Sequence, residues 1–145
     1  MNYGVIRKYK KNEIIFREGE MASCIFELRW GSVGLFTDYG TENERLVTSI
    51  EGEGCIGAFA VFDKAGYKAT AVSLERGTQL ELISSEDFHD FFSSRPAKLL
   101  SITQSLCHLH RKVVLSYSKA CKRIVELEKA MEEKESEGGD GKQSI

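Results

Sequence analysis

The stretch "GCIGAFAVFDKAGYKATAVS", residues 54 to 73, combines three glycines with a short apolar run and ends in a segment that favours a strand. Glycine allows tight turns that other residues resist. The glycines predict turns, and residues 69–74 are predicted to form a strand. The question that this stretch raises is whether the chain binds a phosphate.

Short segments rich in β-branched and aromatic residues surround this unit and are separated by further glycines. Strands of this length at intervals of about ten residues are typical of a small barrel or sandwich. In residues 24–29 and 79–83, successive side chains are expected on opposite faces of the sheet. The predicted strands are residues 12–16, 24–29, 33–36, 46–50, 69–74 and 79–83, with a possible seventh before Tyr9.

The second half of the chain changes to a helical pattern. Residues 84–87, Ser-Ser-Glu-Asp, offer a hydroxyl to cap a helix start and acids for its first turn, so residues 88–92 are predicted to be helical. Pro96, the single proline, suits the first turn of another helix. We therefore expect a short helix followed by a long one.

Apolar residues then recur every three or four positions, which predicts one long amphipathic helix over residues 97–134. At about 50 Å in length this helix must extend past a domain of this size. The overhanging stripe needs a partner, and a second copy of the chain is the simplest one. The predicted dimer contacts are Leu106, Leu109, Val113, Tyr117, Ala120, Ile124 and Leu127.

The composition is that of an ordinary globular domain, with 41% hydrophobic and 29% charged residues and a net charge of -2. This balance gives no electrostatic case for DNA or for an anionic membrane surface, and we expect a cytoplasmic location. The expected domains are a mainly β unit over residues 1–96, the helix over 97–134 and a disordered polar tail over 135–145. Acidic residues near the end of the helix predict fraying beyond about Met131.

Taken together, residues 8 to 125 resemble the cyclic-nucleotide-binding domain of the catabolite activator family. "YKKNEIIFREGE" is similar to the opening strand and turn of that domain, and "IFELRWGSVGLF" is similar to its next strand pair. Residues 54–73 resemble its phosphate-binding cassette, and this resemblance implies a turn, a short helix and a strand in this order. The first backbone N–H groups of such a helix are available to an anion. The resemblance implies an α+β, mainly β fold: a β-roll or jelly-roll barrel with a short helix and a long C-terminal helix.

The cassette departs from the family pattern at both of its charged positions. In the family, a Gly-Glu pair opens the helix and an arginine precedes Ala-Thr; glutamate accepts from the ribose and arginine binds the phosphate. Here Gly57 and Ala69-Thr70 match, whereas Ala58 replaces the glutamate, Tyr67 the arginine and Gly66 a usual proline. Each hydrogen bond to a charged group contributes roughly 1.5 to 3 kcal/mol, so affinity is expected to fall on the order of 100-fold to 10,000-fold.

Two side chains leave alternatives open. Lys68 could supply a point charge to the phosphate, although a solvent-facing side chain is the favoured interpretation. Tyr67 could stack on a base or donate to an anion, but we expect its ring to fill the space that a ligand would occupy. The candidate ligand-binding residues are Gly57, Ala58, Phe59, Tyr67, Lys68, Ala69 and Thr70.

Two hypotheses of different classes follow. The first is a non-catalytic module with weak or lost cyclic AMP or GMP binding, acting through dimerisation or a protein partner. The second is a small-molecule sensor that signals through movement of the long helix. Family members that regulate transcription carry a helix-turn-helix domain after this helix, whereas only polar residues follow here, so we expect a stand-alone domain without DNA binding.

The remaining reactive side chains predict no enzyme, no metal and no cofactor. Cys107 and His110 lie one helical turn apart, but zinc prefers four ligands and no second cluster is evident. Cys24, Cys55, Cys107 and Cys121 show no paired spacing, so we expect no disulfide. The sequence contains neither a Gly-x-Ser-x-Gly elbow nor a Walker loop.

Overall fold

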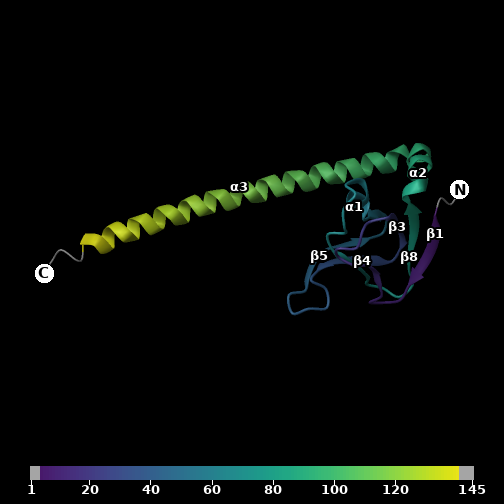
Figure 1. Cartoon of the computed structure of the whole chain (residues 1–145), viewed down its shortest axis with the longest axis horizontal. Helices are drawn as coiled ribbons and strands as arrows, with labels where there is room; N and C mark the ends of the chain where they lie inside the picture. The colour runs from purple at the N-terminus through teal and green to yellow at the C-terminus, as the bar shows by residue number, and fades with distance from the viewer. Residues whose placement is uncertain (1–3, 141–145) are drawn as a thin grey trace. The chain divides into compact units, whose positions relative to one another are not determined.

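The computed structural model describes residues 4–140, and within them the chain forms eight strands in two antiparallel four-stranded sheets (Figure 1). One sheet has the order β1-β8-β3-β6 and the other the order β2-β7-β4-β5. The strands are β1 (Val5–Tyr9), β2 (Ile14–Phe16), β3 (Cys24–Trp30), β4 (Ser32–Thr37), β5 (Arg45–Glu51), β6 (Gly54–Ile56), β7 (Thr70–Ser73) and β8 (Thr78–Ser84).

The six strands predicted from the sequence are all present, and the possible seventh is β1. The prediction missed β6, because three residues between glycines are too few to show an alternating pattern. A glycine is required between β3 and β4: Gly31 has φ +94, and a Cβ there would lie 2.5 Å from Thr78 Oγ1. This tight turn lets β3 continue into β4, which belongs to the other sheet.

Two apolar clusters hold residues up to Ile102 together. The larger lies within the roll and includes Phe16, Phe26 and Tyr67. The smaller joins α1 (Ala58–Phe62) and α2 (Phe88–Ser94) to the first turns of α3 (Pro96–Asp140). Removal of large apolar side chains from water is the main force that stabilises such contacts. The members of the smaller cluster are Ile25, Ala58, Val61, Ile83, Phe91 and Ile102.

The helices follow the predicted order, but the start of the first predicted helix differs from the prediction in its 3-10 turn and in its capping. A single 3-10 turn, η1 (Ser85–Asp87), precedes α2, and the Ser84 hydroxyl donates to the Asp87 carboxylate rather than capping a backbone amide. The predicted hydroxyl cap is wrong, because the Ser84 oxygen accepts no hydrogen bond from a backbone N–H at the start of η1. Pro96 is the first residue of α3, as predicted.

The chain divides into two compact units, residues up to Ile102 and residues from Thr103 onward. In the second unit α3 continues to Asp140, so the predicted end at residue 134 is too early. Residues 135–140 include two glycines, so neither helix propensity nor the charge of the acidic end predicts this extension. The predicted tail residues 141–145 lie outside the described part of the chain. No helix between residues 4 and 140 is long and apolar enough to span a membrane.

Candidate functional site

Gly57 begins α1 in a conformation that other residues rarely adopt. Its φ is 81 and its ψ is 1, in the left-handed region, and it follows directly after β6. The next residues, Ala58 to Phe62, form a single helical segment whose Val61 N–H donates to Gly57 O at 3.3 Å. The turn, short helix and strand predicted for residues 54–73 are therefore present.

Tyr67 points into the roll. Its side chain is only 6% exposed, and its ring stacks on Phe16 with a centroid distance of 3.8 Å and an interplanar angle of 20°. The phenol donates a hydrogen bond of 2.9 Å to the backbone O of Cys24. Burial raises the pKa of the Tyr67 phenol above its usual 10.0, so the ring stays neutral at physiological pH.

Tyr67 and Gly57 are in direct contact. A Cβ placed on Gly57 would lie 2.8 Å from Tyr67 Cε1, so the ring covers the α carbon of the glycine. The backbone of Tyr67 is also fixed, because its N–H donates to Glu20 O at 2.9 Å and its O accepts from Gly19 N–H at 2.8 Å. The space beside Gly57 is therefore occupied by the Tyr67 side chain, which is fixed at its backbone by these two bonds and at its hydroxyl by the bond to Cys24 O.

The other candidate ligand-binding residues are placed as follows. Lys68 is exposed, Ala69 is half-buried, and the buried Thr70 accepts a 3.0 Å hydrogen bond from Glu18 N–H through Oγ1. Ala58 is buried in the smaller apolar cluster, and Phe59 is partly exposed on α1. The structure thus brings together Gly57 and Tyr67, while the Lys68 side chain lies in solvent.

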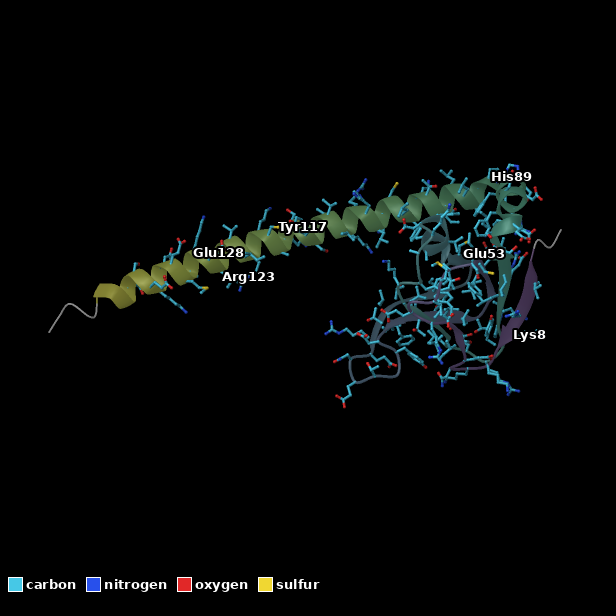
Figure 2. All side chains as sticks on the ribbon, viewed as in Figure 1. Lys8, Glu53, His89, Tyr117, Arg123 and Glu128 are labelled. Atoms are coloured by element: carbon cyan, nitrogen blue, oxygen red, sulfur yellow. The ribbon has the colours of Figure 1, made fainter. Side chains whose placement is uncertain are left out.

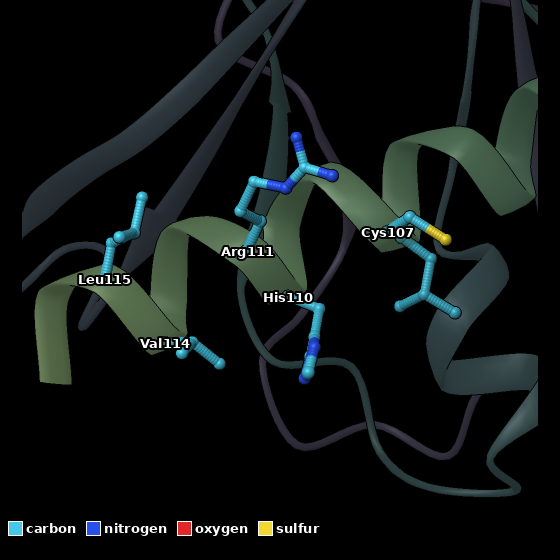
Figure 3. A pocket seen from close by; sticks show the side chains of 6 residues that line it. Cys107, His110, Arg111, Val114 and Leu115 are labelled. Carbon is cyan, nitrogen blue, oxygen red and sulfur yellow. The ribbon is translucent and has the colours of Figure 1, made fainter. Parts of the chain in front are cut away.

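The apolar stripe of α3 is exposed over the unit that begins at Thr103 (Figure 2). Tyr117 is 72% exposed and Val113 is 60% exposed. A shallow hollow of about 530 Å³ lies along this helix, and Figure 3 shows side chains that line it. Its lining residues are Leu106, Cys107, His110, Arg111, Val114 and Leu115.

The cysteine and histidine residues form no metal cluster in the described part of the chain. No group of three or more His, Cys, Asp or Glu side chains in residues 4–140 is arranged to hold a metal ion. The four cysteines are free thiols, with Cys107 exposed and the other three half-buried. Burial raises the pKa of the Cys55 thiol to about 11, which makes it a poor nucleophile.

Sequence reasoning missed one buried polar feature, the pair Glu27 and Glu81. Both carboxylates are enclosed in the sheet of β3 and β8, where alternation alone predicts only that they share a face. The available signal was a glutamate placed directly between two apolar residues in the middle of each strand.

Comparison with known proteins agrees with this architecture. Residues 6–95 match the sequence profile of the family described as the cyclic nucleotide-binding domain. Because this match covers more than half of the 145 residues, the chain belongs to the cyclic nucleotide-binding domain family. No curated protein matches the chain at a significant level.

Solved structures show the same fold. The Thermus thermophilus catabolite activator protein is similar with a TM-score of 0.70 and 22% identity, over 80% of this chain and 54% of that one. A transcriptional regulator from Thermotoga maritima gives a TM-score of 0.66 and 17% identity, over 77% and 86%. A cyclic nucleotide-binding-like protein from Brucella abortus gives 0.54 and 21%, over 62% and 76%.

The chain spans little more than half the length of the Thermus protein. At these identities the similarity shows the fold: a mainly β roll of the cyclic nucleotide-binding type with a long C-terminal helix.

Proposed function

We propose that this chain is a non-catalytic regulatory domain in which cyclic AMP and cyclic GMP binding is weak or lost, and that it acts in the cytoplasm as a homodimer through α3. The family provides the coarse part of this proposal, a cyclic nucleotide-binding regulatory domain. The finer part depends on how this chain has changed its cassette and on the exposed stripe of its long helix.

The contact between Tyr67 and Gly57 carries the proposal. A cyclic phosphate approaching the start of α1 would need the space beside the glycine, and the ring of Tyr67 fills it with Cε1 2.8 Å from a Cβ position on Gly57. Moving the ring away would also break its hydrogen bond to Cys24 O and its stacking on Phe16. Binding at this site would therefore require part of the core to open.

Charge is also unfavourable for an anionic ligand beside Gly57. Tyr67 stands where the family has its arginine, and the cation next to it in the sequence, Lys68, is exposed to solvent. Ala58, in the position of the family's glutamate, is buried in an apolar cluster. Neither a paired guanidinium nor a ribose-binding carboxylate is thus present in the cassette, which supports weak binding of cyclic nucleotides.

Isothermal titration calorimetry with cyclic AMP and cyclic GMP tests the proposal. The wild-type chain is expected to show no binding at millimolar nucleotide, whereas Tyr67→Arg removes the ring from the space beside Gly57, restores the family's phosphate-binding guanidinium and is expected to bind at least one nucleotide measurably. Tyr67→Phe keeps the ring and is the matched control, expected to remain without binding. Micromolar binding by the wild-type chain would contradict the proposal and favour the sensor hypothesis, in which a ligand moves the long helix.

Dimerisation is proposed from the single exposed stripe on α3. From residue 117 onward the stripe fits a heptad repeat, with Ile124 and Met131 in the first apolar position and Ala120 and Leu127 in the second. In the central heptad, Ile124 in the first position and Leu127 in the second form the combination that favours a parallel two-stranded coiled coil. All four side chains are exposed in the single chain. Packing against a second copy would remove them from water, which favours association.

The charges that flank this stripe support the parallel arrangement. Arg123 and Glu128 lie on opposite edges of the stripe, five residues apart, which is the spacing of an interhelical ion pair in a parallel coiled coil (Figure 2). In one chain Arg123 lies 3.5 Å from Glu126, and both side chains are largely exposed. Pairing with Glu128 of a second copy would therefore replace a weak surface contact.

A further inference from the structure

Glu27 and Glu81 form a buried pair of carboxylates in the centre of one sheet. They face each other in register across β3 and β8, and their side chains are 1% and 0% exposed. Two carboxylates in one apolar environment repel each other and lose their hydration. A structure that keeps both must supply cations to them.

Three cations surround the pair, and two of them come from the helical corner rather than from the sheet. Arg29, on β3, donates to Glu81 Oε2 through both Nε and Nη2 and lies 3.4 Å from Glu27 Oε2. Arg95 Nη1, between α2 and α3, donates to Glu27 Oε2 at 3.3 Å. Lys98 Nζ, in the first turn of α3, lies 2.7 Å from Glu27 Oε1.

The two carboxylates are not equally satisfied. Both oxygens of Glu27 contact cations, whereas Glu81 Oε1 is buried without a hydrogen-bond partner among residues 4–140. Among residues 4–140, Arg29 is thus the only cation that contacts Glu81, and the hydrogen bond to Glu81 raises the pKa of Arg29 above its usual value. Glu27 is therefore the acid that Arg95 and Lys98 neutralise.

The position of Glu27 also connects it to the cassette. β3 pairs with β6, and Glu27 lies opposite Cys55, two residues before Gly57. On the same face of β3 as Glu27, Ile25 belongs to one apolar cluster with Ala58 of α1 and Ile102 of α3. One end of the cassette and the first two turns of α3 are thus held against the same short segment of β3, residues 25–27.

We propose that Glu27 is the positioning residue that holds the first turn of α3 on the cassette-bearing sheet, through Lys98 and Arg95, and that this ionic joint couples the cassette to α3. A buried carboxylate that loses cations is strongly disfavoured, and departure of the first turn of α3 from β3 would leave Glu27 with Arg29 as its remaining cation among the described residues. A displacement of β6 moves the residue opposite Glu27 and so changes the geometry of the joint.

This inference does not depend on whether the cassette binds a nucleotide or whether α3 dimerises. Loss of ligand binding and loss of the joint are measured by different methods, so either can fail without the other.

Hydrogen exchange with mass spectrometry on the full chain tests the joint. In Lys98→Met, backbone amides in peptides that cover residues 96–102 are expected to exchange on the order of tenfold or more faster than in the wild type, because one charged hydrogen bond is lost. Lys98→Arg restores a cation and is expected to restore slow exchange. Lys112→Met, an exposed cation on the same helix, is expected to leave these peptides unchanged.

A core variant separates local release from general loss of stability. Val72→Ala removes a buried side chain from β7, a strand of the other sheet, and is expected to lower global stability without selectively accelerating exchange in residues 96–102. If Lys98→Met accelerates exchange no more selectively than Val72→Ala, or if Lys98→Arg fails to restore protection, Glu27 is not a positioning residue for α3.

Coupling to the cassette is tested by combining two changes. Gly57→Ala disturbs the start of α1 and is expected to accelerate exchange in residues 96–102 when Lys98 is present. In the Lys98→Met background the same change is expected to add little, because the joint is already open. Fully additive effects would show that the cassette and the joint act independently, and would overturn the coupling.

Discussion

The ring of Tyr67 lies directly against the α carbon of Gly57, with Cε1 only 2.8 Å from the place where a Cβ would be. Residue 57 must therefore be glycine for two reasons: a Cβ would clash with the ring, and φ at this residue is +81, which favours glycine. The same contact fills the part of the cassette that an anion would approach.

Gly57→Ala is expected to destabilise the domain by about 2 to 4 kcal/mol, measured by urea unfolding. The left-handed conformation contributes about 1 to 2 kcal/mol of this, and the contact with the Tyr67 ring contributes the rest. Gly40→Ala is the matched control, since Gly40 has φ +83 but nothing within 4 Å of its Cβ position. Equal losses for the two variants would show that the ring does not press on Gly57.

Tyr67→Ala is expected to cost about 3 to 5 kcal/mol of unfolding free energy, as for other buried aromatic side chains. Tyr67→Phe keeps the stacking on Phe16 and loses only the hydrogen bond to Cys24 O, so its cost is expected to be about 1 kcal/mol. Chemical denaturation measures both. A negligible loss for Tyr67→Ala would mean that the ring is not part of the core.

The stability of the domain is expected to fall as pH rises above about 9. Burial raises the pKa of the Cys55 thiol from 9.0 to about 11, so the folded state keeps a proton that the unfolded state loses. The stability that Cys55 contributes through this proton is fully present below pH 9 and is lost as pH rises through about 11. The free energy of unfolding falls by at most about 1.4 kcal/mol per pH unit in this range. Burial raises the pKa of Tyr9 and Tyr67 as well, which extends the decline.

Urea unfolding at pH 8 and pH 10.5 measures this decline. Cys55→Ala is expected to make the decline shallower, whereas Cys107→Ala, at an exposed thiol, is expected to leave it unchanged. An identical pH dependence in wild type and Cys55→Ala would assign the decline to the tyrosines.

The fold could be predicted from the sequence because glycine spacing and helical periodicity depend on local residues. For residues 54–73 the resemblance to the family cassette implied the turn, helix and strand, and Pro96 marked the start of α3. The end of α3 was predicted too early, because the glycines and the acidic side chains of residues 135–140 both disfavour a helix, and yet the helix continues to Asp140.

The cassette was only partly predictable. Sequence identified Gly57 and Tyr67 as the positions that matter, but the direction of the Tyr67 ring depends on Phe16 and Cys24, which lie more than 40 residues away in the chain. The joint at Glu27 was not predictable, because its cations come from residues 29, 95 and 98 and only the packing of α3 against β3 brings them together.

Ile124→Glu is expected to abolish self-association of the chain. The residue is 55% exposed in the single chain and lies in the centre of the proposed dimer stripe, so a charge there would be buried by a second copy. Lys119→Glu places the same charge on the opposite face of α3 and is the control, expected to leave the dimer intact. Sedimentation equilibrium measures both, and a monomeric wild type would contradict dimerisation through α3.

A charge exchange between Arg123 and Glu128 tests the direction of the two helices. In a parallel dimer, Arg123→Glu places like charges at both symmetry-related Arg123–Glu128 pairs, and the dissociation constant is expected to rise by about tenfold. Adding Glu128→Arg recreates the opposite pairing and is expected to restore wild-type affinity. In an antiparallel dimer these two positions do not meet, so the second change would give no recovery. Because the intrachain contact of Arg123 is with Glu126 and not with Glu128, recovery of affinity in the double variant reports on the second copy of the chain.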